Sequence, residues 1–293
     1  MKKLIGSLLV SFLLLGIATA VAQEKSEAMG GGPPKVLLIF REFLKPGKMG
    51  MTHEKTESLF VQAYAKAKWP THYFAADSLS GKPRSLFFVG YDSFAAYEKD
   101  FLAMQKNSAL AAALDHAGVV DGELQSEGDG RLFVFNEKYS MRAPADIAHM
   151  RYFDIEVFHV KPGHHHEWDE AVKLVKDAYE KIPDAHWAMF EQLFGGEMGT
   201  YIVFTPLKSL AEVDASFAQG KQFQENMGME GMKKLAELER SALASAASHQ
   251  LFQFNPRMSY PPDPWVKADP DFWKVKPAPA AAPKKSEKEP SKQ

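Results

Sequence analysis

The chain repeats a series of short sequences at an offset close to 116 residues, and this repetition limits the folds it can adopt. Lys-Pro-Gly occurs at 45–47 and again at 161–163, an offset of 116. Ala63-Tyr64 recurs as Ala178-Tyr179 at an offset of 115, and the ending LFVFN at 132–136 recurs as LFQFN at 251–255, an offset of 119. An ordered series of matches favours an internal duplication. Two unrelated α+β domains are the alternative.

Both repeats show the same order of predicted elements: strand, helix, two strands, helical segment, strand. In the first repeat these are 36–40, 52–68, 71–79, 85–91, 92–118 with a break near Asn107, and 131–140. In the second they are 151–160, a helix containing Trp168 and Tyr179, 186–194, 200–204, 207–245 with interruptions at Gly220, Gly228 and Gly231, and 249–260. This β-α-β-β-α-β order is that of a ferredoxin-like unit. We therefore predict an α+β protein with two tandem ferredoxin-like units.

The strand composition predicts how the two units meet. In a ferredoxin-like unit both helices lie on one face of the sheet and leave the other face bare. Val36, Leu38 and Phe40 alternate with Leu37 and Ile39, so the first strand is apolar on both faces. Such a strand has to be covered on both sides. We expect the bare face of one unit to cover that of the other, so that the units pack sheet to sheet.

Two such units in one chain resemble the dimeric α/β-barrel superfamily, here as a tandem fusion that forms an intramolecular pseudo-dimer. The resemblance spans about residues 35–260 and rests on element order and duplication. The superfamily includes proteins similar to antibiotic-biosynthesis monooxygenases, NIPSNAP-like proteins, haem-degrading enzymes and chlorite-dismutase-like proteins. No motif assigns this chain to one of these branches, so the resemblance implies a fold more than a function.

The ends of the chain differ from the two repeats. Residues 1–22 have two lysines, an apolar run and small residues before Ala22, which predicts a secretory signal peptide and a secreted or periplasmic protein. A retained N-terminal anchor is the alternative. The linker at 23–34 leads into the first unit, 35–142, which is followed by the second unit, 148–260. In the tail, 261–293, we expect Trp265, Phe272 and Trp273 to pack over the fold, and disorder from about residue 278.

Composition excludes several functions. The chain has no cysteine, which excludes disulfides, thiol nucleophiles and cysteine-ligated metals. A formal net charge of −2 gives no basic footprint for nucleic acid. No segment after the signal peptide is long and apolar enough to predict a transmembrane helix.

Three consecutive histidines, His164, His165 and His166, are the most conspicuous ligand types in the sequence. Adjacent residues cannot all face one ion, and a metal would need ligands from other elements. We interpret them as part of a helix start, and keep them only as weak metal candidates. The methionines Met227, Met229 and Met232 favour flexible packing of a kinked helix over thioether binding of copper.

The strand 151–160 offers another candidate site. Phe153, Ile155 and Val157 share one face, which we expect to pack on helices. The opposite face is then expected to look into the space between the sheets, where it would form a pocket for a small ligand. Solvent exposure at an open sheet edge is the alternative for its acids. The pocket candidates are Tyr152, Asp154 and Glu156 on this strand, Glu42 on the first strand, His72 and His186 at the starts of the second strands, and Gln253 on the last.

These observations favour a non-catalytic exported protein, monomeric as its own pseudo-dimer or homodimeric, that holds a small apolar or amphipathic ligand. We predict no cofactor. The first alternative is a monooxygenase-like or haem-handling enzyme, in which His72, His186, Asp154 and Glu156 would be acid–base groups or ligands. The second is an interaction or structural protein tethered to the envelope by its charged tail.

Overall fold

The computed structural model describes residues 32–144 and 146–274. The predicted signal peptide, most of the linker and the tail beyond 274 lie outside the described residues. Within those residues, no helix combines the length and the apolar composition needed to cross a bilayer.

The first half of the chain contains four strands and three helices among its described residues, with bounds set by local signals. The helical segment predicted for 92–118 is interrupted at Asn107, as expected. There the Asn107 side chain accepts a hydrogen bond from the backbone N–H of Leu110 and caps a new helix. The elements are β1 (Val36–Leu44), α1 (Met51–Ala67), β2 (Tyr73–Ser78), β3 (Arg84–Tyr91), α2 (Phe94–Lys106), α3 (Ser108–Gly122) and β4 (Gln125–Phe135).

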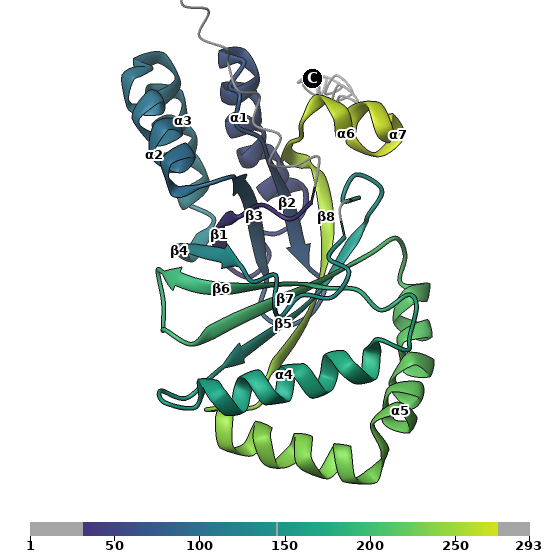
Figure 1. The fold of residues 1–293 in the computed structure, drawn as a ribbon. Coiled ribbons are helices and arrows are strands. Elements are labelled where there is room, and N and C mark those ends of the chain that lie inside the picture. The colour runs from purple at the N-terminus through teal and green to yellow at the C-terminus, as the bar shows by residue number, and fades with distance from the viewer. Residues whose placement is uncertain (1–31, 145, 275–293) are drawn as a thin grey trace, which may run out of the picture.

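The second half follows the same order and ends with two short helices. Its long helix bends at Gly228, which has φ 66° and ψ 170°, so the predicted interruption is confirmed there (Figure 1). The elements are β5 (Tyr152–His159), α4 (His165–Tyr179), β6 (Ala188–Phe194), β7 (Thr200–Leu207), α5 (Ala211–Ala242), β8 (Ser248–Tyr260), α6 (Asp263–Ala268) and α7 (Pro270–Trp273).

The strands form a closed barrel in the order β1-β3-β2-β8-β5-β7-β6-β4. The first half contributes β4-β1-β3-β2 and the second contributes β8-β5-β7-β6, all antiparallel. Two seams join the halves by backbone pairing, β2 with β8 and β4 with β6. The predicted α+β class is confirmed. The two sheets were expected to pack face to face. They are also joined by strand pairing at both edges, and this closure leaves no unpaired edge strand among the described strands of the barrel.

Strand pairing defines corresponding positions in the two halves. Val36 on β1 lies opposite Tyr91 on β3 and Val134 on β4. Tyr152 on β5 lies opposite Leu207 on β7 and Gln253 on β8. The offsets between these pairs are 116 for β1/β5 and β3/β7, and 119 for β4/β8, the same offsets found in the sequence repeats.

The barrel interior is the main hydrophobic core, and it reverses one prediction. Phe153 and Ile155 belong to the interior core with Leu37, Ile39 and Phe88, and Val157 packs against it. The expectation that this face of the strand packs on helices is therefore wrong. Strands enclose this apolar part of the interior on all sides, so a charge without a partner would be costly there. The alternate face, with its acids, lies outward on the helix side, where cover is incomplete.

The helices lie outside the barrel. Figure 1 shows α1, α2 and α3 on one side of the strands and α4 and α5 on the opposite side, with α6 and α7 beside the end of β8. Trp265 of α6 and Trp273 of α7 pack into the interior core, and the Trp265 ring centroid lies 5.5 Å from that of Phe74. The predicted packing of these tail aromatics over the fold is confirmed.

Candidate functional site

A cavity of about 450 Å³ lies inside the barrel, toward the end where β1 and β5 finish. Its apolar wall includes Ile39, Leu86, Phe133, Ile155 and Ile202. These side chains come from both halves of the chain. The remaining lining residues are Arg41, Phe43, Arg84, Arg131, Val157, His159, Gln192, Gly196, Glu197, Thr200, Ser248 and Gln250.

Two of the three lining arginines share one carboxylate. Arg41 and Asp129 lie directly opposite each other on β1 and β4, and Arg41 Nε donates to Asp129 Oδ1 over 2.6 Å. Arg131 lies 3.3 Å from Asp129 Oδ2 and donates to Gln192 Oε1 over 3.1 Å. Hydrogen bonding to the Arg41 guanidinium, together with the charge of Arg131, holds the pKa of Asp129 below its usual range despite partial burial.

Arg84 differs because it has no carboxylate partner. The residue is 8% exposed, and among the described residues no acid lies within 4.0 Å of its guanidinium. It donates instead to the Gln250 side chain and to the Lys82 carbonyl, and its guanidinium lies 5.0 Å from the Phe252 ring centroid. Burial and the nearby Arg41 lower the pKa of Arg84, but a guanidinium stays charged in proteins. A buried, unpaired positive charge therefore faces the cavity.

The second half supplies His159, Thr200 and Glu197 to the same cavity. The Thr200 hydroxyl donates to the Glu197 carbonyl over 2.8 Å, and His159 Nδ1 lies 3.1 Å from Thr200 Oγ1. A hydroxyl has one proton to donate, so His159 donates to Thr200 through Nδ1–H. In the neutral imidazole this leaves the lone pair on Nε2, which can accept a proton.

A tight turn between β6 and β7 holds the loop that carries Glu197. Gly195 has φ 87°, and a Cβ at this position would clash with the Gly130 carbonyl on β4. Only glycine permits this close approach. The turn therefore fixes the loop against the strand that carries Arg131.

None of the seven predicted pocket residues lines this cavity. Tyr152, Asp154, Glu156 and Gln253 lie on the outward faces of β5 and β8, in the register opposite to the interior residues. Asp154 pairs with His249, over 2.5 Å. Burial, with Asp154 and Glu239 nearby, raises the pKa of Glu156 although His249 opposes the shift.

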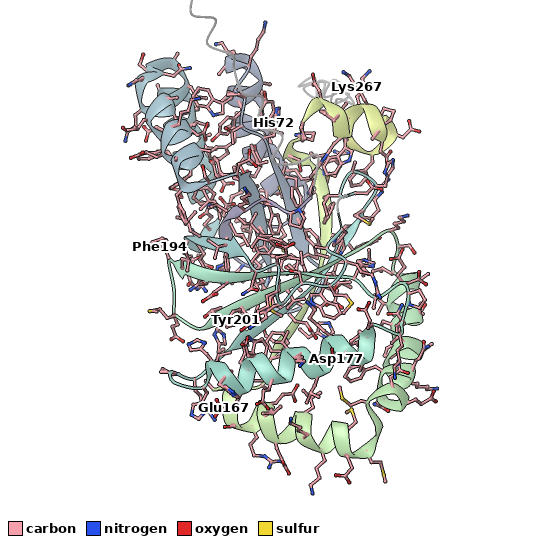
Figure 2. The ribbon with its side chains drawn as sticks, viewed as in Figure 1. His72, Glu167, Asp177, Phe194, Tyr201 and Lys267 are labelled. Atoms are coloured by element: carbon pink, nitrogen blue, oxygen red, sulfur yellow. The ribbon has the colours of Figure 1, made fainter. Side chains whose placement is uncertain are left out.

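The predicted histidines are not brought together. His72 stacks on Tyr260 with 4.7 Å between ring centroids, and burial lowers its pKa. His186 contacts the carbonyls of Asp184 and Pro206. Figure 2 shows His72 on the α1 side of the barrel and Tyr201 near α4, so the two helix layers lie on opposite sides of the barrel.

The histidine triplet lies at the start of α4. His164 is the residue before the helix, and its Nδ1 lies 3.2 Å from Glu167 Oε1 and 3.3 Å from the Ser241 hydroxyl. His165 and His166 are exposed, and His166 Nδ1 lies 3.5 Å from Glu170. The interpretation as a helix start matches this placement.

Glu42 is placed elsewhere, in a buried cluster with His53, Glu57 and Asp121. These are residue types that bind metal ions, and one atom from each lies within 4.8 Å of the others. The sequence analysis missed His53, Glu57 and Asp121. The available signal was the spacing of His53 and Glu57, which places both on one face of a helix.

A closed eight-stranded barrel of described residues, with helices outside it, is the fold of the dimeric α/β-barrel superfamily, as the sequence resemblance implied. No protein-family model matches the chain, and no curated protein matches it. Among solved structures, an anthrone oxidase-like protein matches 75% of this chain and 92% of its own, with a TM-score of 0.50 and 17% identity.

Two further solved structures match at lower similarity. A protein described as a monooxygenase from Fusobacterium nucleatum matches 75% of this chain and 91% of its own, with a TM-score of 0.47 and 12% identity. A protein described as a chlorite dismutase matches 77% of this chain and 96% of its own, with a TM-score of 0.46 and 10% identity. The match with the anthrone oxidase-like protein, at 17% identity, shows the fold alone.

Haem is the cofactor that this superfamily resemblance raises, and the cavity does not fit it. A haem iron needs an axial His, Cys, Met or Tyr. The inner wall consists of Ile39, Leu86, Phe133, Ile155 and Ile202, which cannot ligate iron. His159, which also lines the cavity, lies at the end of β5 beside Thr200. The apolar wall itself therefore offers no axial ligand.

Proposed function

We propose that the barrel binds one small amphipathic anion, with its acid group on the arginines at the cavity mouth. Arg84 carries this proposal. A buried charge without a counter-ion is costly, and a bound carboxylate, sulfonate or phosphate would remove that cost. Arg41 and Arg131 add positive potential beside it, which Asp129 only partly neutralises.

The apolar body of the ligand is supported by the deeper wall of the cavity. That wall is aliphatic and aromatic, as in most small-molecule sites, and its volume of about 450 Å³ lies within their usual range. Burial of an apolar body would supply affinity, and the guanidiniums would fix its orientation. The predicted small amphipathic ligand thus keeps its place in the barrel, with a different set of contact residues.

Fluorescence titration with anilinonaphthalene sulfonate, an aromatic anion, tests this function. Arg84→Met removes the charge and keeps an apolar side chain of similar reach. We expect Arg84→Met to weaken binding by about 30-fold, equivalent to about 2 kcal/mol. Arg257→Met is the matched control, because Arg257 is an exposed arginine of β8 with a loose contact to Glu54.

The uncharged parent, anilinonaphthalene, separates charge recognition from apolar binding. We expect the wild type to bind it more weakly than the sulfonate, and Arg84→Met to bind both dyes alike. Equal affinity of wild type and Arg84→Met for the sulfonate would contradict the proposal.

Oxidation of the bound ligand is the second candidate function, and His159 favours it. The Nε2 lone pair of His159 would accept a proton from a ligand C–H or O–H group in the cavity, and molecular oxygen would be the oxidant that accepts the electrons of the resulting anion. The name of the anthrone oxidase-like protein suggests anthrone as a first probe. Oxygen uptake with anthrone above the spontaneous rate, lost in His159→Gln, would support an enzyme; uptake equal to the spontaneous rate would support a binding protein.

We also propose that the two halves are tandem ferredoxin-like copies and that the protein is exported. The shared strand order and the equal register offsets support the duplication. The sequence before Ala22 supports export. Mass spectrometry of the protein from the extracytoplasmic fraction should give an N-terminus at Gln23; an intact Met1 would contradict cleavage of a signal peptide, and absence of the protein from that fraction would contradict export.

A further inference from the structure

Three carboxylates and one imidazole are buried together between the outer face of the first-half sheet and helices α1 and α3. His53 Nε2 is at the centre, 3.0 Å from Glu42 Oε2, 3.5 Å from Asp121 Oδ1 and 3.9 Å from Glu57 Oε1. His53, Glu57 and Asp121 are each at most 3% exposed. One imidazolium could balance only one of these three acids.

Glu57 is the group that this arrangement leaves without a partner. Its Oε1 is buried and makes no hydrogen bond with any described residue, although it faces His53. By contrast, Asp121 accepts from Thr56 Oγ1 over 2.5 Å and from Gln125 Nε2 over 2.6 Å. A buried carboxylate oxygen without a donor costs free energy unless something else binds it.

The electrostatics agree with this geometry. Burial, with the charges of Glu42 and Asp121, raises the pKa of Glu57 well above its usual range. Burial also raises the pKa of Glu42, against the hydrogen bond from His53. Ionising all three acids at once is therefore costly, and a bound cation would offset that cost.

His53 is held with Nε2 toward the carboxylates by contacts on its other side. Its Nδ1 lies 3.3 Å from Ser85 Oγ, and Ser85 donates to the Asp77 carboxylate. Asp77 in turn accepts from Asn255 Nδ2 over 2.8 Å, across the β2–β8 seam. Since the Ser85 proton goes to Asp77, Ser85 accepts from His53 Nδ1–H, so Nε2 is the ring nitrogen that faces the carboxylates. In the metal-free protein Nε2–H donates to Glu42, and a metal ion would replace that proton. Metal-binding histidines are oriented by partners of this kind.

We propose that Glu42, His53, Glu57 and Asp121 bind one divalent transition-metal cation of the Mn²⁺, Fe²⁺ and Zn²⁺ class. Three carboxylates with one imidazole suit these ions better than the all-oxygen sites of Ca²⁺ or Mg²⁺. Ligand atoms on opposite sides of such an ion are about 4.2 Å apart, given bonds of about 2.1 Å. The four ligand atoms already lie within 4.8 Å of one another, so small side-chain movements complete the site.

Access to the site lies past Glu42. The side chain of Glu42 is 17% exposed, whereas those of the other three ligands are almost fully enclosed. A bound ion would therefore exchange slowly and resist brief exposure to a chelator.

Metal analysis and thermal unfolding of the whole protein test the site with Zn²⁺ and Mn²⁺ as the probes. After exhaustive chelation and dialysis, we expect one of the two ions to rebind at about one per chain and to raise Tm. Glu57→Gln removes one ligand and keeps the side-chain volume. It should lose both the bound ion and the metal-dependent rise in Tm. Glu156→Gln is the matched control, because Glu156 is a half-buried acid in the second half, and it should keep both.

Circular dichroism of metal-free Glu57→Gln guards against a folding defect, and Asp121→Asn provides a second ligand variant. A wild-type Tm that neither ion changes would overturn the site. Equal metal content and equal Tm shift in wild type and in folded Glu57→Gln would overturn it too. Dye binding at the Arg84 cavity is measured separately, so the two proposals fail independently.

Discussion

At one set of corresponding positions, the layer between sheet and helices is ionisable in the first half of the chain and mainly aromatic in the second. Trp168 occupies the central position in the second half, with its ring centroid 5.1 Å from Phe158 and 5.5 Å from Tyr201. His53 occupies it in the first half. The corresponding pairs are Glu42 and Phe158 on β1 and β5, His53 and Trp168 on α1 and α4, Ser85 and Tyr201 on β3 and β7, and Glu57 and Val172 on α1 and α4.

The barrel wall shows a second asymmetry in the same direction. The three arginines of the cavity all come from the first half. By the strand register, Val157 corresponds to Arg41, Thr200 to Arg84 and Gln250 to Arg131. All six residues line the cavity, so at these positions the first half is cationic and the second half is uncharged.

The same arrangement of strands and helices therefore accommodates ionisable side chains in one half and aromatic side chains in the other. In the second half, close-packed rings stabilise the fold. In the first half, the same positions hold charge at an energetic cost, which indicates that they are kept for binding. Stability should therefore depend most on the second half, and ligand and ion binding on the first.

Among the variants that test this comparison, Trp168→Ala should change the free energy of unfolding the most. The residue is buried against Tyr139, Phe158 and Tyr201, and its removal leaves a cavity that the β-sheet cannot close. We expect urea unfolding to show a loss of about 3–5 kcal/mol in the free energy of unfolding. Trp168→Phe should lose clearly less. A loss below about 2 kcal/mol for Trp168→Ala would mean that the aromatic layer is not the stabilising one.

Glu57→Gln should have the opposite sign in the metal-free protein. The amide removes one of three crowded carboxylates and can donate to its neighbours. We expect a gain of about 1–3 kcal/mol in the free energy of unfolding. The exposed acid Glu127 gives the control, since Glu127→Gln should change stability by no more than about 0.5 kcal/mol. Destabilisation of metal-free Glu57→Gln would contradict the view that the first-half layer is costly.

Asp129→Asn sharpens the comparison of the two cavity walls. It frees Arg41 and Arg131 from their shared carboxylate and should increase affinity for anilinonaphthalene sulfonate. Because the Asp129 side chain is 30% exposed, we expect about a fivefold gain at most, equivalent to about 1 kcal/mol. The gain should shrink at high salt, measured in the same titration. Weaker binding by Asp129→Asn would argue against charge recognition at this wall.

The pH dependence of stability should differ in sign between acids of the two halves, and this is the smallest effect. Asp129 has a folded-state pKa below its unfolded value of about 3.9, so it stabilises above that pH and loses its contribution as pH falls through the folded pKa. Glu156 has a folded-state pKa above its unfolded value of about 4.3, so its cost is absent at low pH and complete at pH 7.

Unfolding of the two variants between about pH 3 and 7 measures this difference. Relative to wild type, Asp129→Asn should become less stable as pH rises, and Glu156→Gln should become more stable. Parallel pH profiles for the two variants would show that the local environments do not set these pKa shifts.

The fold was predictable because its signals are local or repeated. A capping residue predicted the interruption at Asn107, and a glycine predicted the kink at Gly228. The equal offsets predicted two matching sets of strands. The orientation of the strand faces was not predictable from β1, since Val36 through Phe40 are apolar on both faces. On β5 the alternation was clear, but whether barrel or helices take the apolar face depends on barrel closure, which no single strand encodes.

The candidate sites depended on long-range pairing. Arg84 follows a turn and resembles an ordinary surface residue in the sequence. It is buried because β2 pairs with β8 and brings Gln250 and Phe252 beside it. His53 and Glu57 were visible as a helical pair, but Asp121 joins them from a helix more than 60 residues away, with a separation of 65 from Thr56.

All three arginines of the cavity lie at its mouth. A guest molecule that enters on this side passes Arg41, Arg84 and Arg131. Its acid group would then be the last part to enter and the first to leave. Dissociation would begin with rehydration of that acid group. The dissociation rate should therefore depend more on how strongly water competes for the guanidiniums than on the hydrophobicity of the apolar body.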